Sequence, residues 1–452
     1  MRSKRNAVIL LLLLTTIVCR KADEPCLTCP PPYVQTVFLD TLSVDVTEVL
    51  LRVRGTDTSG AVQLALYRDS LLVYTGQPAR GDTTVLDTAL APARLYTYKV
   101  YRLTPTSSGQ AGQPANQPTD STQLVVRTMD STSHNFIFQI DTLGDGSSSV
   151  LYDVAIINDT LVYAVGAIYL RDSVGNWDPN AYNMAKWNGQ RWEPMRIQFY
   201  TICPGGSDRT PYPAKAVFAF SETDVWIAMD GSQMARWNGT TQTATICNPD
   251  PFVINKIWGE NPNSIWAVGY GGRIGHYTSG TWQRVESGTT LPINDVWGAR
   301  SLVTGGEEVL CVASNQFINQ GKRLLRIESA GVTQIPDSGL SWDLSTVWHV
   351  PARRYFIGGD GLYHSRSLGP IWYRDVAFPP YYKTAIRGVG LRDIVVVGAF
   401  GLLMHFNGVT WQNFQSITYM ASGSFTAVEI KGNLIVAVGG VDNRAVVARG
   451  MR

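Results

Sequence analysis

The sequence has little charge and almost no long apolar run. Only 16% of its 452 residues are charged, and the formal net charge is +2. This balance leaves no basic stripe, so we exclude nucleic acid as a partner. The most apolar run, Val8–Leu14, is far shorter than the roughly 20 residues that a membrane-spanning helix needs. We therefore expect a globular chain without a transmembrane segment.

Recognisable catalytic motifs are also missing. The sequence has no Gly-x-Ser-x-Gly nucleophile elbow and no phosphate-binding loop. Of its five histidines, His276, His364 and His405 occupy the same position of a sequence repeat. We interpret them as a structural feature of the repeat, because one imidazole per repeat does not converge on a metal. We expect no metal and no cofactor, and binding rather than catalysis.

The first residues are typical of an exported protein. Three basic residues precede the apolar run, which has the length of a signal-peptide core, and Cys19 follows it. This order resembles that of bacterial lipoproteins, although Thr16 and Val18 depart from the residues preferred there. The resemblance implies a signal peptide at 1–18, lipid attachment at Cys19 and a Pro-rich tether over 19–34. An ordinary secretory signal is the alternative, but no A-x-A-like cleavage site lies nearby.

A lipid anchor would place the protein in the cell envelope, at the outer membrane and on its periplasmic or cell-surface face. Loss of residues 1–18 removes three basic and no acidic residues, so the net charge changes from +2 to −1. We expect a monomer that touches the membrane only through its lipid.

The six cysteines raise the question of disulfides, since exported proteins form them. Cys26 and Cys29 flank two residues in the tether, where a local disulfide or two free thiols are expected rather than zinc or redox chemistry. Cys203 and Cys247 lie at similar points of consecutive repeats and are candidates for a second bridge. Cys311 lies in an apolar run and is expected to be buried and free.

Residues 35–128 alternate apolar and polar positions in short runs separated by Gly, Asp and Pro, a pattern typical of an antiparallel β-sandwich. The segment LAPARLYTYKV (90–100) resembles a corner of fibronectin type III domains, where a Leu-x-Pro turn leads into a Tyr-x-Tyr-x-Val strand. That resemblance implies that a tyrosine hydroxyl braces the corner. The tryptophan usual in that family is missing, and Leu50 or Leu51 would replace it.

From residue 134 the sequence repeats with a period near 40. One unit, INKIWGENPNSIWAVGYGGRIGHYTSGTWQRVE (254–286), divides into four short strands. Four strands per period of about 40 residues predict the blade of a β-propeller. The units begin with an apolar pair spaced i, i+3: Leu151/Val154, Ala214/Val217, Ile254/Ile257, Ile293/Val296, Leu344/Val347, Ile386/Val389 and Phe425/Val428.

The seventh unit ends at Arg452 without a fourth strand, and an unassigned strand, Asn135–Ile140, precedes the first. Added to the last blade, it would close a seven-bladed ring over 134–452 and leave no open edge. The repeats resemble those of extracytoplasmic bacterial propellers that read VWG…WAVG…GxW, some of which are labelled glucosyltransferases. The expected fold is therefore all-β: a fibronectin type III-like sandwich followed by a seven-bladed propeller that an N-terminal strand closes.

Candidate ligand contacts lie at the turns between second and third strands, because these turns share one rim of a propeller with the loops that join consecutive blades. We single out Asp230, Tyr270, Arg273, Asp360 and Phe400. Ordinary hairpin turns explain the Asp-Gly pairs equally well. The long insertion in the first blade, which contains Trp177, is a further candidate loop.

Our leading hypothesis is a non-catalytic surface or periplasmic lipoprotein whose propeller binds a protein or a glycan. A carbohydrate-active enzyme, like a glucosyltransferase or a glycosidase, is the first alternative, and an assembly factor for an envelope complex is the second. Two converging carboxylates in the channel would favour the enzyme. An apolar rim would favour protein assembly, and exposed Trp, Tyr and Asn would favour glycan.

Overall fold

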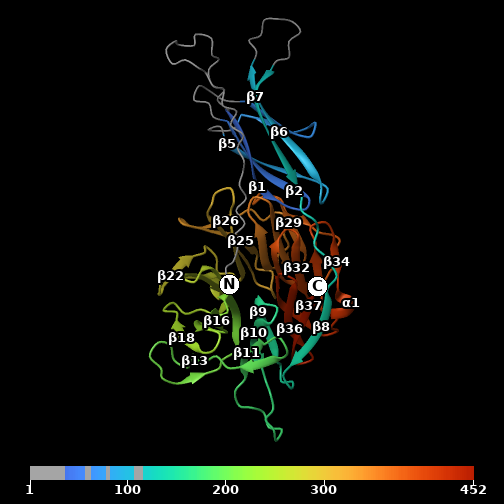
Figure 1. The fold of residues 1–452 in the computed structure, drawn as a ribbon. Coiled ribbons are helices and arrows are strands. Elements are labelled where there is room, and N and C mark those ends of the chain that lie inside the picture. Colours follow the sequence, from blue (N-terminus) through green and yellow to red (C-terminus); the bar gives the residue numbers. More distant parts are fainter. Residues whose placement is uncertain (1–35, 56–62, 78–81, 106–115) are drawn as a thin grey trace, which may run out of the picture.

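The computed structural model describes residues 36–55, 63–77, 82–105 and 116–452 (Figure 1). The predicted signal peptide, Cys19, the tether and the pair Cys26–Cys29 lie outside the described residues. Within them, no helix is long and apolar enough to cross a membrane. The described part of the chain is all-β, as predicted, with two sheets before residue 130 and mostly four-stranded sheets after it.

The two N-terminal sheets pack face to face. One has the order β1-β2-β5 and the other β4-β3-β6-β7. Leu51 of the first sheet and Leu66 and Tyr98 of the second meet in one apolar core. Tyr96 braces the adjacent corner, since its hydroxyl accepts a 2.8 Å hydrogen bond from the amide of Ala91. The strands are β1 (Val37–Val44), β2 (Glu48–Gly55), β3 (Gln63–Arg68), β4 (Leu71–Gly76), β5 (Asp82–Thr88), β6 (Leu95–Pro105) and β7 (Asn116–Arg127).

Each repeat of the C-terminal region folds into an antiparallel four-stranded sheet, and the described residues form seven of them. The first three are β9 (Val150–Asn158), β10 (Leu161–Ile168), β11 (Tyr182–Trp187) and β12 (Trp192–Met195); β15 (Ala214–Ser221), β16 (Asp224–Met229), β17 (Gln233–Trp237) and β18 (Gln242–Cys247); β19 (Ile254–Asn261), β20 (Ser264–Gly269), β21 (Arg273–Thr278) and β22 (Thr281–Glu286). A short pair, β13 (Phe199–Tyr200) and β14 (Arg209–Thr210), lies between the first two.

The other four sheets follow the same plan. They are β23 (Ile293–Arg300), β24 (Glu307–Ser314), β25 (Lys322–Glu328) and β26 (Gly331–Ile335); β27 (Leu344–Val350), β28 (Arg354–Gly359), β29 (Leu362–Ser365) and β30 (Tyr373–Arg374); β31 (Lys383–Gly390), β32 (Asp393–Gly398), β33 (Leu403–Phe406) and β34 (Trp411–Asn413); β35 (Ser424–Lys431), β36 (Leu434–Val441), β37 (Arg444–Met451) and β8 (Ile137–Leu143). A short helix, α1 (Gln415–Thr418), precedes the last sheet.

The first strands of the sheets line a central channel. Contacts run from β9 to β15, β19, β23, β27, β31 and β35, and β35 contacts β9 again. Apolar clusters fill the space between neighbouring sheets; one joins Val154 and Ala164 of the first sheet to Val436 and Val447 of the last. The sheets therefore bury their apolar faces against one another around the channel.

The last sheet takes its outer strand from the beginning of the repeat region. β8 pairs antiparallel with β37, from Ile137 opposite Met451 to Leu143 opposite Ala445. The strand thus starts two residues later than the expected Asn135–Ile140 and ends three residues later, at Leu143. Backbone pairing with the whole length of β37 explains the difference.

Near its start, every first strand has an extra residue relative to its neighbour. In the third sheet, Ile254 lies opposite Gly269 and Lys256 lies opposite Val268, so Asn255 is bulged out of the pairing. A Cβ on Gly269 would lie 1.9 Å from the carbonyl oxygen of Val253, which explains the glycine that ends the second strand.

The bulge also accounts for the i, i+3 spacing of the apolar pairs, and it corrects one of them. In the sixth sheet the bulge lies between Lys383 and Ala385, so the true pair is Lys383/Ile386 and not Ile386/Val389. Val389 is exposed, whereas Lys383 is buried and donates a hydrogen bond from its ammonium to the carbonyl of Pro379. Because Lys383 occupies a position that is apolar in the other six sheets, the pattern of apolar pairs did not reveal this pair in the sequence.

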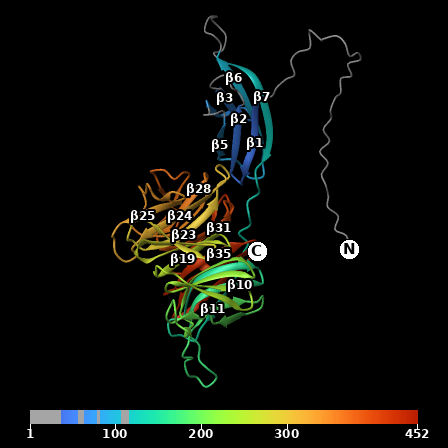
Figure 2. The ribbon, with the colours of Figure 1, turned by 90° about the vertical axis from the view of Figure 1, so that its left-hand side faces the viewer.

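A buried ion pair joins the sandwich to the propeller. The Glu48 carboxylate lies 2.8 Å from the Arg353 guanidinium and 2.9 Å from that of Arg366, and Glu48 and Arg353 are each only 2% exposed. These arginines lie beside β28 and β29, at the rim that carries the first-to-second and third-to-fourth turns. In both views the sandwich extends from the orange and red sheets (Figures 1 and 2). Loss of one partner would leave the other charge buried without a counter-ion. This contact therefore fixes the orientation of the sandwich.

The pairing of β8 yields a test with a matched control. Phe136→Ala should lower the free energy of unfolding by about 3–5 kcal/mol, because this buried ring packs in one cluster with Phe414 and Phe425. Ile137→Ala, next to it but 82% exposed, should change it by less than about 0.5 kcal/mol. Tryptophan fluorescence during urea unfolding reports on the propeller alone, because all 13 tryptophans lie after residue 134. Equal effects of the two variants would mean that this segment belongs to the linker.

Candidate functional site

The bulged residues of the seven first strands all face one cavity of about 290 Å³ at one end of the central channel. We call them the bulge ring: Tyr152, Lys215, Asn255, Asn294, Ser345, Thr384 and Thr426. Tyr270, Gln316 and Tyr382 complete the mouth of the cavity. The bulge thus turns a side chain that would lie within a sheet into the channel.

Five members of the bulge ring join neighbouring sheets, and all five do so in the same way. Each side chain donates a hydrogen bond to the carbonyl oxygen of the residue that precedes the bulge in the next sheet. The distances are 3.0 Å for Asn255 to Ile293, 2.7 Å for Asn294 to Leu344, 2.5 Å for Ser345 to Lys383, 2.6 Å for Thr384 to Phe425 and 2.6 Å for Thr426 to Leu151. Such bonds satisfy carbonyls at strand ends and hold consecutive sheets in register.

Tyr152 and Lys215, in the first two sheets, are the exceptions. Neither side chain makes a hydrogen bond or an ion pair with the described residues; the Lys215 ammonium lies over the Tyr152 ring, 3.9 Å from its centroid. Burial lowers the pKa of Lys215 and raises that of Tyr152, and the Asp230 carboxylate acts on both from a distance. A largely buried ammonium without a carboxylate beside it is therefore available to a ligand.

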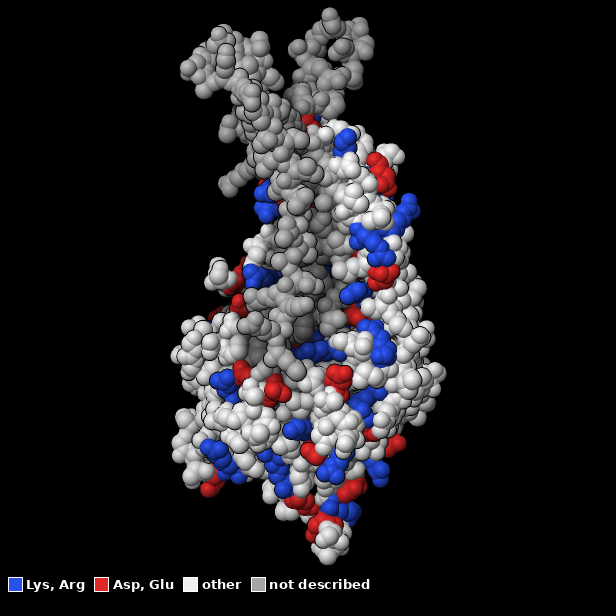
Figure 3. Space-filling model, viewed as in Figure 1, with Lys and Arg blue, Asp and Glu red and all other residues white. Residues whose placement is uncertain are grey.

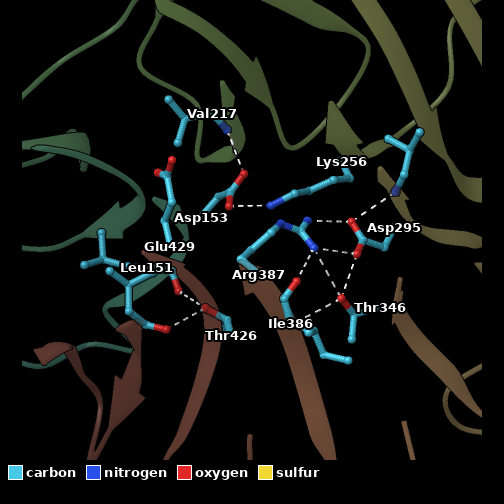
Figure 4. Close-up of polar contacts among 12 residues, drawn as sticks. Leu151, Asp153, Val217, Lys256, Asp295, Thr346, Ile386, Arg387, Thr426 and Glu429 are labelled. Atoms are coloured by element: carbon cyan, nitrogen blue, oxygen red, sulfur yellow. Dashed lines mark hydrogen bonds and ion pairs between the residues drawn. The ribbon is translucent and has the colours of Figure 1, made fainter. Parts of the chain in front are cut away.

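Two ion pairs form the floor of the cavity. Lys256 binds Asp153 at 2.5 Å, and Arg387 binds both oxygens of Asp295, at 2.8 and 3.0 Å (Figure 4). Burial alone would raise the pKa of Asp295, but Arg387 holds it below its ordinary value. Lys256 and Arg387 also line a second cavity of about 140 Å³ on the far side, so this charged layer divides the channel.

Asp153 and Asp295 also join sheets. Asp153 accepts a hydrogen bond from the amide of Val217 at 2.9 Å, and Asp295 accepts one from the amide of Val347 at 3.0 Å. Each carboxylate is therefore committed to a cation and to a backbone amide of the next sheet. Neither is free to act as the acid or base that glycoside hydrolysis requires.

Glu429 lies beyond this layer, facing the second cavity. Burial raises the pKa of its carboxyl to about 7, although the hydrogen bond from the amide of Ile156 and the nearby ammonium of Lys431 lower it. The carboxylate of Asp153, which also faces the second cavity, raises the pKa of Glu429, and the ammonium of Lys256 lowers that pKa. Glu429 is thus the carboxyl of the channel whose proton exchanges near neutral pH.

The predicted rim residues do not form one constellation. Tyr270 lines the mouth of the cavity and is 53% exposed, whereas Arg273 is paired with Asp250 at 3.2 Å. Asp230 acts on Lys215 and Tyr152 without touching them. The backbone carbonyl of Asp360 accepts a 3.3 Å hydrogen bond from the guanidinium of Arg374, on the outer strand of its own sheet. Of the five, only Tyr270 lines the cavity.

Phe400 is held away from the protein interior on the same rim. Its backbone has a φ of 57°, a left-handed conformation that bulky residues rarely adopt. Its ring contacts that of Tyr381 at 5.2 Å, and its carbonyl accepts hydrogen bonds from the α1 segment. Nearby on that segment, Ile417 and Tyr419 are 54% and 63% exposed. These four residues form the apolar rim patch: Tyr381, Phe400, Ile417 and Tyr419.

The repeat-equivalent histidines contact different partners. His276 stacks on Trp266 with ring centroids 3.8 Å apart, and His405 bonds to Asp393 at 2.8 Å. In the part of the chain that the structure describes, no group of three or more His, Cys, Asp or Glu is placed to hold a metal ion. Cys203 and Cys247 form a disulfide, and Cys311 is free and buried.

Sequence reasoning missed the bulge ring, although its signal was present. Two residues separate the members of each recurring apolar pair, whereas a regular strand would place one there. The first of the two is the bulge residue, and the second supplies Asp153, Lys256 and Asp295. The irregular spacing therefore marks the residues that face the channel.

Glu429 makes stability depend on pH. The folded protein holds its proton up to about pH 7, whereas an unfolded chain loses it near 4.5, so stability falls as pH rises between these values. Glu429→Gln cannot ionise, and its advantage in unfolding free energy over wild type should grow between pH 5 and pH 8, by up to about 3 kcal/mol. Urea unfolding at both pH values measures this. Glu286→Gln, at a side chain that is 77% exposed, is the control, and an advantage for Glu429→Gln that does not change with pH would refute the assignment.

Comparisons with known proteins identify the architecture. No protein-family model matches the sequence, and no curated protein matches it. Among solved structures, YCF48 bound to D1 peptide is 16% identical, with a TM-score of 0.50 over 71% of this chain and 99% of that one.

Two further structures are more distant. A catalytically inactive virginiamycin B lyase from Staphylococcus aureus with quinupristin is 12% identical, with a TM-score of 0.48 over 69% of this chain and 99% of that one. The WD40 β-propeller domain of Doa1 is 13% identical, with a TM-score of 0.46 over 69% and 96%. The four-stranded sheets around a central channel, together with the likeness to YCF48, show that this chain has a β-propeller fold.

Proposed function

We propose that this chain is a non-catalytic, lipid-anchored envelope protein whose propeller binds a protein partner at the mouth of the central cavity. The proposal rests mainly on the bulge ring, in which the side chains of Tyr152 and Lys215 contact each other but make no hydrogen bond or ion pair with the described residues. A bulge residue that serves only the fold would be expected to join the next sheet, as the other five members do.

The placement of the sandwich supports binding at the mouth of the central cavity. Through Glu48 it contacts Arg353 and Arg366, on the rim that carries the first-to-second turns. The cavity opens between the second-to-third turns, such as that at Tyr270, which lie at the opposite ends of the same strands. The sandwich therefore leaves the mouth uncovered, and a tether at its N-terminus would hold the propeller away from the membrane.

The proposal also includes the type of the sandwich and the number of propeller blades. The sandwich is of the fibronectin type III kind, which its three- and four-stranded sheets and the corner bond of Tyr96 support. The propeller has seven blades, a number that the seven four-stranded sheets of the described residues support. The strand β8 closes the ring at the last blade.

The surface around the mouth favours a protein over a glycan or an enzymatic substrate. The apolar rim patch exposes Phe400, Ile417 and Tyr419, and exposed apolar groups of this kind mark protein contacts. Asp153 and Asp295 are both neutralised by cations, which disfavours a glycosidase. On the face seen in Figure 3, acidic and basic residues are interspersed over the described part of the chain. The peptide bound to the propeller protein YCF48 is consistent with this mode.

Site-specific photo-cross-linking in living cells tests the proposal. A photo-reactive phenylalanine analogue in place of Tyr270, at the mouth, should give discrete protein adducts in the envelope fraction. The same analogue in place of Thr223, on an exposed turn at the other rim, is the control and should give none. No adduct at Tyr270, or the same adducts at both sites, would refute binding at the mouth. A sugar-containing adduct without added protein would support the glycan alternative instead.

The anchor is tested in the same cells. Cys19→Ser should move the protein from the membrane to the soluble fraction, because the chain is expected to have no other attachment. Equal membrane association of the two proteins would contradict the lipoprotein assignment.

A further inference from the structure

From the asymmetry of the bulge ring we infer that Lys215 and Tyr152 form a subsite for a single carboxylate of the bound partner. This inference deepens the proposed function and rests on it. It assigns a chemical class to the group that enters the cavity: a carboxylate, from either an acidic side chain or a chain terminus.

The charges of the cavity leave one cation unpaired. Lys256 is held by Asp153 and Arg387 by Asp295, so the floor is neutral overall. Lys215 makes no ion pair with the described residues, although the Asp230 carboxylate favours its charged form from a distance, and its ammonium lies over the ring of Tyr152. One free positive charge matches one carboxylate. A phosphate carries more charge, and the guanidinium fork that would suit it, that of Arg387, is already occupied.

The geometry provides a second donor. Among the described residues, the hydroxyl of Tyr152 has no hydrogen-bond partner, unlike the hydroxyls of Thr384 and Thr426 at equivalent positions. Tyr152 and Lys215 belong to adjacent first strands, β9 and β15, and both line the same cavity. A carboxylate between them can accept one charge-assisted hydrogen bond from the ammonium and one from the phenol, one for each oxygen.

The shape of the cavity limits how the ligand enters. The charged layer of Lys256 and Arg387 closes it below, so it receives a side chain or a chain end and not a strand that passes through the channel. A volume of about 290 Å³ is at the lower end of small-molecule pockets. The rest of the partner would lie on the apolar rim patch and around Tyr270.

The burial of Lys215 gives the subsite its affinity for a carboxylate, and it also makes binding measurable through the pKa of the Lys215 ammonium. The lowered pKa of Lys215 reflects the cost of holding its charge away from water. A carboxylate beside the ammonium favours the charged form, so binding must raise this pKa. A ligand without negative charge would leave it unchanged or lower it further.

The first experiment measures that pKa in the full mature chain, by ¹³C NMR of reductively methylated lysines. Lys215→Arg, which lacks the signal, assigns it. The probes are N-acetyl-triglycine with a free carboxylate, its C-terminal amide, and an amide-capped N-acetyl-Gly-Glu-Gly. We expect the free acid or the glutamate peptide to raise the pKa of Lys215 and the neutral amide to leave it unchanged. A rise with only one of the two acids identifies the source of the carboxylate, and a rise with neither overturns the inference.

The second experiment separates this inference from the proposed function. With the photo-reactive group at Tyr270, Lys215→Met should reduce the apparent affinity for the cross-linked partner on the order of tenfold to a hundredfold, and Lys215→Arg should restore part of it. Lys186→Met, on β11 outside the cavity, is the matched control and should have no effect. Unchanged cross-linking by Lys215→Met overturns the carboxylate subsite while leaving the proposed function intact. Absence of cross-linking in the wild type refutes the proposed function itself.

Discussion

The extra residue in the first strand of each sheet is the constraint on which the rest of the propeller depends. Because it interrupts the pairing at the same point in every repeat, it pushes the backbone toward the second strand. Glycine then lies at or near the end of that strand in five sheets, where a Cβ would lie 1.9–2.1 Å from a carbonyl oxygen: Gly166, Gly269, Gly359, Gly398 and Gly439. The same distortion turns seven side chains into the channel, where five of them bind the next sheet. One backbone irregularity therefore links strand pairing, contact between sheets and the lining of the cavity.

Besides the repeated bulge, the channel contains ion pairs that do not recur from sheet to sheet. The ion pairs Asp153–Lys256 and Arg387–Asp295 connect sheets that are distant in sequence and close the cavity below. Together with the ion pair of Glu48 and Arg353 they place charge where the fold otherwise buries apolar groups. Such pairs stabilise only as complete units, since the loss of one partner leaves an uncompensated charge. Lys215 is the cation of the cavity that makes no ion pair with the described residues, which is why we assign it to a ligand.

The sequence predicts the all-β class and the four-stranded repeat, because both leave local periodic signals. The repeat also led to the segment that became β8, although its limits were set by the length of β37 and could not be inferred locally. The site was largely missed. A period shows which positions are equivalent but not which side chains converge, so Tyr270 was recognised at the mouth while the ion pairs of the floor were not. Those pairs, and that of Glu48, join residues separated by 92 or more positions, a distance over which no sequence pattern acts.

The unfolding free energies of two conservative variants distinguish the structural members of the bulge ring from the two that make no bond to the next sheet. Thr384→Val keeps the shape of the side chain but removes its hydrogen bond to the carbonyl of Phe425, which still accepts one from the hydroxyl of Ser424. A loss of about 0.5–1.5 kcal/mol is therefore expected. Tyr152→Phe removes a hydroxyl that has no partner among the described residues, and a change below about 0.5 kcal/mol is predicted. A loss for Tyr152→Phe as large as that for Thr384→Val would show that both serve the fold, and would contradict the account.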